Sequence, residues 1–232
     1  MKWPNLCFIG MLSIFLIGLS GCAKNVALKK TLWEKPDAKV GIAIETLPEL
    51  HTQQKGGGLG LLEVGINALV NSTLRDHLKE TSCDSFSGIK KKFAGRIKAG
   101  GLEPIIIDDY IDVKSLPEVE NKQEGKSDID VSSLAEKYDV DYLLMLKIKS
   151  VGTTRNYFFV IPVGAPKAYC VAGGKLIEGK TNEEYWAYTM KQDEVKVDIE
   201  GEWDNPPDYP ELDAAIEKAI AQAVAQVESN FN

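Results

Sequence analysis

From residue 38 onward, the apolar residues alternate between the compact runs typical of strands and the three-to-four-residue spacing typical of helices. Residues 39–44 form a short β-type run, which predicts the first strand. Residues 61–78 carry apolar side chains at helical spacing and predict a helix. Phe86, Ile89, Phe93 and Ile97 would share the apolar face of a second helix, which Gly100 and Gly101 end.

The second half of the chain continues this alternation. Residues 105–107 predict a buried strand, and a long acidic and polar loop should follow from Asp108. The remaining elements are a short helix, three strands with a turn at 179–182, and a C-terminal helix: residues 131–138, 141–148, 167–177, 184–191 and 211–231. The order β-α-α-β-α-β, followed by a β meander, predicts an α/β (α+β) domain with a mixed sheet that the last helix covers on one face.

The amino-terminal residues have the layout of an export signal. Lys2 is followed by an almost entirely apolar run at 6–19, which is shorter than the roughly 20 residues that a membrane-spanning helix needs. Leu19-Ser20-Gly21-Cys22 resembles the lipobox of bacterial lipoproteins. That resemblance implies cleavage after residue 21 and a diacylglycerol on Cys22; an ordinary signal peptide with a chance cysteine is the alternative.

The lipobox resemblance also implies a location. Ala23 stands where an Asp would resemble an inner-membrane retention signal, so the expected place is the periplasmic face of the outer membrane. Two or three acyl chains on one cysteine give stable anchoring, whereas one chain does not. Residues 1–21 are therefore expected to be a signal peptide, 22–37 a lipidated, Lys-rich tether, and 38–232 a single folded domain.

Charge and cysteine count narrow the classes of function. The formal net charge is -7, from 27 Lys and Arg against 34 Asp and Glu, which disfavours binding to nucleic acid. Cys7 would leave with the signal peptide and Cys22 would carry lipid, so Cys83 and Cys170 remain. In an oxidising compartment these two could form a disulfide; two buried, unreactive residues are the alternative.

No enzyme, metal or cofactor signature is complete. The two histidines, His51 in an expected loop and His77 near a helix end, lack the spacing of metal ligands, and no Gly-x-Ser-x-Gly elbow occurs. The glycine run at 55–60 departs from both phosphate-binding patterns, which favours a flexible loop. Asp108 and Asp109 fit a solvated loop better than a site at the carboxyl end of a strand.

Two stretches have compositions that are unusual for segments with a purely structural role. Residues 156–166 form an apolar, proline-broken run that includes Tyr157, Phe158, Phe159 and Ile161, which predicts either an exposed protein interface or a crossover that lines the core. Residues 193–213 carry nine carboxylates and one lysine, so this stretch is either a solvated excursion or a dock for a basic partner.

Residues 135–146 and 174–186, together with the lipobox and the order of elements, resemble a group of α/β envelope lipoproteins. The group includes the curli secretion lipoprotein, the penicillin-binding-protein activator lipoprotein and the amino-terminal domain of the Tol translocation protein TolB. The resemblance implies a non-enzymatic assembly, accessory or regulatory role with a protein partner in the envelope. A small periplasmic hydrolase and a carrier of lipid or peptidoglycan fragments are the alternatives.

Overall fold

A seven-stranded mixed sheet forms the centre of the molecule. The computed structural model describes residues 25–56, 72–119, 122–159 and 161–232. The main path of the sheet runs β3-β1-β4-β5-β6, with β2 beside β4 and β7 beside β5. Strands β1, β3 and β4 are parallel, whereas β4, β5 and β6 form an antiparallel meander. The predicted α+β class, mixed sheet and meander are therefore confirmed.

The elements have the following bounds. The strands are β1 Lys39–Glu45, β2 His51–Lys55, β3 Glu103–Ile111, β4 Tyr142–Phe158, β5 Ile161–Glu178, β6 Glu184–Thr189 and β7 Lys196–Asp198. The α-helices are α2 Ser72–Glu80, α3 Ile89–Ala99, α4 Ser132–Lys137 and α5 Pro210–Ser229, and the short 3-10 helices are η1 Lys30–Glu34, η2 Asp84–Gly88 and η3 Val113–Ser115.

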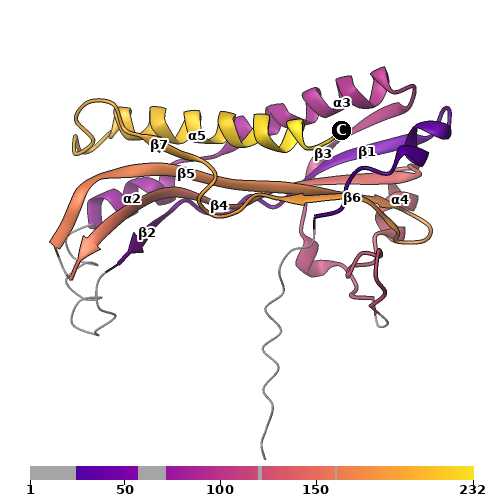
Figure 1. Cartoon of the computed structure of the whole chain (residues 1–232), viewed down its shortest axis with the longest axis horizontal. Helices are drawn as coiled ribbons and strands as arrows, with labels where there is room; N and C mark the ends of the chain where they lie inside the picture. The colour runs from indigo at the N-terminus through magenta and orange to yellow at the C-terminus, as the bar shows by residue number, and fades with distance from the viewer. Residues whose placement is uncertain (1–24, 57–71, 120–121, 160) are drawn as a thin grey trace, which may run out of the picture.

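Helices lie on both faces of the sheet. In Figure 1, α3 and α5 form a layer over one face, and α5 contacts β5 along its length. The helical pattern predicted this packing, because the apolar side of α5 is buried: Leu212, Ala215, Ile216, Ala219, Ile220, Ala223, Val224 and Val227. On the other face, α4 closes a smaller core of apolar side chains around Ala43, Leu143 and Met145.

The end of α5 is held by aromatic packing. The ring of Phe231 lies edge-on to Trp186 of β6, with 5.0 Å between the ring centres, and it also contacts Phe93 of α3 at 5.0 Å. The Trp186 indole N–H donates a hydrogen bond of 3.0 Å to the carbonyl oxygen of Asn230. These contacts join the sheet and both helices of the layer.

The tether prediction is wrong for residues 25–37, which belong to the folded body. The Val26 N–H donates to the Ala187 carbonyl at 2.7 Å, and the Lys29 N–H donates to that of Tyr185 at 2.9 Å, so the segment lies along the edge of β6. Leu32 of η1 is fully buried. The segment is polar apart from a few apolar residues, so its composition resembles a tether. Leu28 and Leu32 nevertheless pack in the core and hold the segment on the body.

The prediction of a buried strand at 105–107 is also wrong in part. The strand exists, but β3 lies at the edge of the sheet and extends to Ile111. Ile106 is 42% exposed, while Ile107 is buried. An edge strand presents one side to solvent, so a run of three apolar residues need not be buried throughout.

Two glycines end α3, as predicted, for different reasons. Gly101 has φ +86°, which is the left-handed conformation that glycine adopts at least cost. Gly100 allows a close approach, because a Cβ there would lie 2.1 Å from Cζ3 of Trp33. The helix predicted over 61–78 is confirmed for its described part, α2, and residues 61–71 lie outside the described residues.

Candidate functional site

The apolar stretch around Tyr157 forms the end of a long hairpin. The stretch is paired strand and not a crossover: Tyr157 faces Pro162 and Phe158 faces Ile161 across β4 and β5. The hairpin extends beyond the layer of α3 and α5 and bends away from it (Figure 1). Two strands of 17 and 18 residues therefore carry this stretch away from the core.

The side chains at this end differ sharply in exposure. Phe158, Phe159, Ile161 and Val163 are 66%, 61%, 62% and 53% exposed, and we call these four the hairpin tip. Tyr157, which sequence reasoning placed in the same interface, is 7% exposed and belongs to the packed part of the hairpin. The strand period explains the difference, because neighbouring residues point to opposite faces.

The base of the tip is held by Arg155. Its Nε donates a hydrogen bond of 2.8 Å to the Gly164 carbonyl across the hairpin. Its guanidinium lies over the Trp203 ring at 4.7 Å from the ring centre, which is a favourable cation–π geometry. The hairpin is thus connected to the acidic stretch at 193–213, a contact that the sequence pattern did not indicate.

The acidic stretch pairs with lysines of the same chain. Asp198 of β7 lies 2.7 Å from the Lys167 ammonium of β5, Asp193 pairs with Lys55, and Glu200 lies 3.0 Å from Lys218. The short strand β7 inside this stretch pairs with β5. β7 and these ion pairs hold the first part of the stretch on the body, while most of its side chains are exposed, as expected of a solvated segment; docking of a basic partner stays a prediction.

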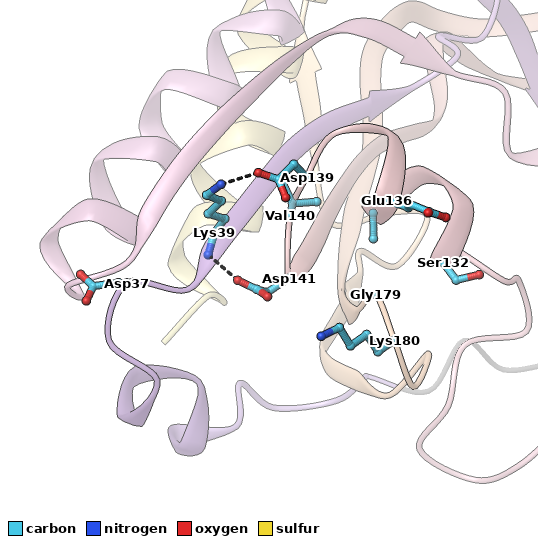
Figure 2. A pocket seen from close by; sticks show the side chains of 10 residues that line it. Asp37, Lys39, Ser132, Glu136, Asp139, Val140, Asp141, Gly179 and Lys180 are labelled. Carbon is cyan, nitrogen blue, oxygen red and sulfur yellow. Dashed lines mark hydrogen bonds and ion pairs between the residues drawn. The ribbon is translucent and has the colours of Figure 1, made fainter.

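A second candidate is an open hollow of about 690 Å³ at the amino ends of β1 and β4 (Figure 2). The Lys39 backbone N–H donates to Asp141 Oδ2 at 3.0 Å, and the Lys39 ammonium pairs with Asp139. That pair raises the pKa of Lys39 and lowers the pKa of Asp139. Glu136 and Lys180 complete a charged lining, which differs from the deep apolar pocket that a lipid carrier would need.

Asp108 and Asp109 are predicted to lie in a loop after the strand. The structure places both within β3. Their side chains point to solvent, and Asp109 accepts a hydrogen bond of 3.1 Å from the Tyr138 hydroxyl. The bulge between Ile106 and Tyr110 explains the misplacement, since the strand continues past two charged residues.

The histidines make structural contacts. His51 lies in β2, not in a loop, and its Nε2 is 2.8 Å from the Tyr169 hydroxyl. His77 Nε2 is 2.8 Å from Asp213 Oδ1, and the same nitrogen is 3.3 Å from Thr81 Oγ1. In a catalytic triad the carboxylate and the nucleophile lie on opposite ring nitrogens of the histidine, whereas Asp213 and Thr81 lie on the same nitrogen of His77, so the arrangement does not match a triad.

The two cysteines are buried in the larger core as free thiols. Burial raises the pKa of Cys83 to about 11 and the pKa of Cys170 to about 12, so both stay protonated at neutral pH. This is the setting of packing residues and not of nucleophiles. The disulfide between them stays a prediction for the oxidised protein.

Several predicted features lie outside the described residues. These include Cys22 and the glycine run beyond Gly56. Within the ranges that the structure describes, no group of three or more His, Cys, Asp or Glu side chains could hold a metal ion. The same ranges contain no helix that is long and apolar enough to cross a membrane.

Comparison with known proteins gives distant similarities of fold. No protein-family model and no curated protein matches the chain. Among solved structures, lipoprotein GNA1162 from Neisseria meningitidis is 10% identical with a TM-score of 0.31, and the match covers 82% of this chain and 99% of that one. A Xanthomonas campestris protein assigned to DUF330 is 10% identical with a TM-score of 0.39, over 88% and 87% of the two chains.

A third similar structure is the PelC dodecamer from Paraburkholderia phytofirmans, at 10% identity and a TM-score of 0.29, with 89% of this chain and 96% or more of that chain covered. At these identities and TM-scores, none of the similarities assigns a function. The narrower group of curli, activator and TolB-type proteins stays a prediction from sequence.

Proposed function

We propose that this chain is a lipoprotein of the bacterial envelope, anchored through Cys22 at the periplasmic face of the outer membrane, which acts by contact as a non-enzymatic assembly, accessory or regulatory component. The observation that carries the proposal is the hairpin tip. Four large apolar side chains stand in solvent at the end of two paired strands, where they add nothing to the core. Such a patch on a folded body is typical of a contact surface.

The anchoring part of the proposal rests on Leu19-Ser20-Gly21-Cys22. Because the folded body begins by Val26, a lipid on Cys22 would hold it close to the bilayer: four residues span at most roughly 14 Å. The partner expected from sequence is a protein of the envelope, and the contact surface would be the hairpin tip.

Fractionation of cells that carry Cys22→Ser tests the anchor. The wild-type chain should stay with membranes through a high-salt wash, whereas the variant should lack the mass of the lipid and be released by the same wash, with an unchanged unfolding midpoint. Cys7→Ser is the matched control, since it removes a cysteine outside the lipobox and should leave the chain with the membranes. A Cys22→Ser chain that stays on membranes through the high-salt wash and keeps the wild-type mass would contradict the anchor.

A further inference from the structure

The chemistry of the hairpin tip indicates what it binds. Residues 158–166 read FFVIPVGAP, and no side chain among them can donate or accept a hydrogen bond. Protein interfaces usually surround their aromatic anchors with a polar, hydrogen-bonding rim. A surface made of hydrocarbon alone is better matched to the acyl region of a bilayer, where polar side chains are costly.

The backbone of the tip is suited to an apolar medium. Tyr157 pairs with Pro162 and Phe158 pairs with Ile161, so the two strands stay paired close to the turn, and Pro162 has no backbone N–H that needs a partner. Unpaired backbone groups are the main obstacle to placing a chain in lipid, so a paired hairpin end can enter the interface at low cost.

Phe159 is an unfavourable residue for the stability of the turn in which it lies. Its φ is +53°, in the left-handed region, where Gly or Asn is preferred at hairpin ends. The Phe159 side chain gains little from the fold, because it is 61% exposed and its ring contact is with Phe158, itself exposed. An aromatic ring held in a costly conformation at a surface indicates a role outside the fold.

The charge on the two long strands of the hairpin is basic, although the acidic stretch at 193–213 lies beside the base of the hairpin. From Tyr142 to Ile177 the chain has five basic residues and no acidic residue, although the whole protein has a net charge of -7. Lys55, Arg155 and Lys167 lie nearest the tip, on strands that pair with each other. Lys55 and Lys167 pair with Asp193 and Asp198, while among the described residues no carboxylate pairs with Arg155.

We propose that the hairpin tip inserts shallowly into an anionic phospholipid bilayer, with the basic residues behind it at the level of the headgroups. Aromatic and aliphatic side chains backed by Lys and Arg are the pattern of interfacial membrane binding. The inference rests on the proposed function in taking the tip as the contact surface, but it commits to lipid as the partner. Anchoring at Cys22 and insertion at the tip would then fix the body to the membrane at two points.

Vesicle co-sedimentation tests the proposal with residues 23–232. This chain contains all of the described core, whose first member is Leu28, and it lacks the lipid anchor. Vesicles of phosphatidylcholine with phosphatidylglycerol should bind it more tightly than phosphatidylcholine alone, and added salt should weaken the binding. Combined Phe158→Ser, Phe159→Ser and Ile161→Ser should weaken it on the order of tenfold or more, with little change in unfolding midpoint.

Two matched variants separate the contributions. Ile106→Ser with Tyr110→Ser removes two exposed apolar side chains from β3, far from the hairpin in sequence, and should leave vesicle binding unchanged. Lys55→Gln with Lys167→Gln should reduce the preference for phosphatidylglycerol, by about fivefold per charge for a residue near the surface, without changing binding to neutral vesicles.

The lipid inference would be overturned if the wild-type chain binds neither kind of vesicle, or if the tip variant binds vesicles as tightly as wild type. If the tip variant then loses a crosslinked protein in cells, the tip binds protein and the proposed function stands. If Cys22→Ser stays on membranes and the tip variant loses no contact of any kind, the proposed function itself fails.

Discussion

At the scale of single residues, substitution of Phe159 should affect stability and vesicle binding in opposite directions. Phe159→Asn should hold or raise the free energy of unfolding, by up to about 1 kcal/mol, because Asn tolerates a left-handed φ at lower cost. The same change should weaken vesicle binding, since it removes an exposed ring. Chemical denaturation and co-sedimentation measure the two effects on one sample.

Phe158→Asn is the control for that experiment. Phe158 is exposed to a similar degree, and it is not among the residues with positive φ, so its replacement should weaken vesicle binding without any gain in stability. A loss of stability in Phe159→Asn would show that the ring packs within the fold, and the interpretation of the tip would fail.

Glu45 provides a pH-dependent prediction. Burial at the end of β1 raises its pKa above the ordinary value, against the opposing effect of Lys147 and Lys175. The folded state therefore holds this proton more tightly than the unfolded state. The resulting contribution to stability is fully present below the unfolded-state pKa and is lost as pH rises through the folded-state pKa.

Glu45→Gln should consequently increase the free energy of unfolding at pH 7 and change it least at acidic pH, where the wild-type carboxyl is already neutral. Urea unfolding at both pH values measures this. Glu103→Gln, at the start of β3, is the matched control, because it makes the same substitution at an exposed carboxyl. An equal effect of Glu45→Gln at every pH would mean that the carboxyl does not titrate as inferred.

At the scale of elements, a substitution in the segment at 25–37 tests whether this segment contributes to the stability of the folded body. Leu32→Ala should lower the free energy of unfolding by about 2–5 kcal/mol, because it leaves a cavity at a fully buried site. Thr31→Ala, at an exposed neighbour, should have little effect. A free tether would give no difference between the two variants in thermal or chemical unfolding.

The elements that the sequence predicted are those with a clear local apolar pattern, either a continuous buried run or a helical period. Strand β1, helix α3 and helix α5 each bury one clear apolar pattern, and the structure confirms them. Strand β2 reads HTQQK and has no such pattern, since its position depends on parallel pairing with β4. Tertiary pairing of this kind leaves no local signal.

The candidate site was predictable in composition but not in geometry. An apolar run broken by prolines indicates an exposed edge or loop, and Phe158, Phe159 and Ile161 are exposed. The burial of Tyr157 and the contact between Arg155 and Trp203 depend on strand register and on a segment far along the chain. Neither relation can be read from residue spacing alone.

At the scale of the whole molecule, Cys83 lies on the helical side and Cys170 lies in the sheet, both within the larger core. Cys83 immediately precedes η2, Cys170 lies in β5, and both belong to the larger core. We expect a disulfide between them in protein taken from an oxidising compartment, where a link across so long a loop would add about 4 kcal/mol of stability. Thiol labelling of unreduced, denatured protein should then detect neither of them.

Labelling of both cysteines would rule the bond out and assign them to packing alone. Reduced protein provides the reference, since both thiols should react once the chain is denatured. In the folded, reduced protein both should react slowly, because each thiol is buried and has a raised pKa.

The continuity of β4 has a consequence for motion. The same strand begins between two cores at Tyr142 and ends in solvent at Phe158, without a break in its pairing to β5 other than two register shifts. Amide hydrogen exchange should therefore form a gradient along one element, slowest near Leu144 and fastest beyond the shift at Asn156. Fraying can start at the outer end and stop at a register shift, so the tip can adapt its shape to a surface while the core remains closed.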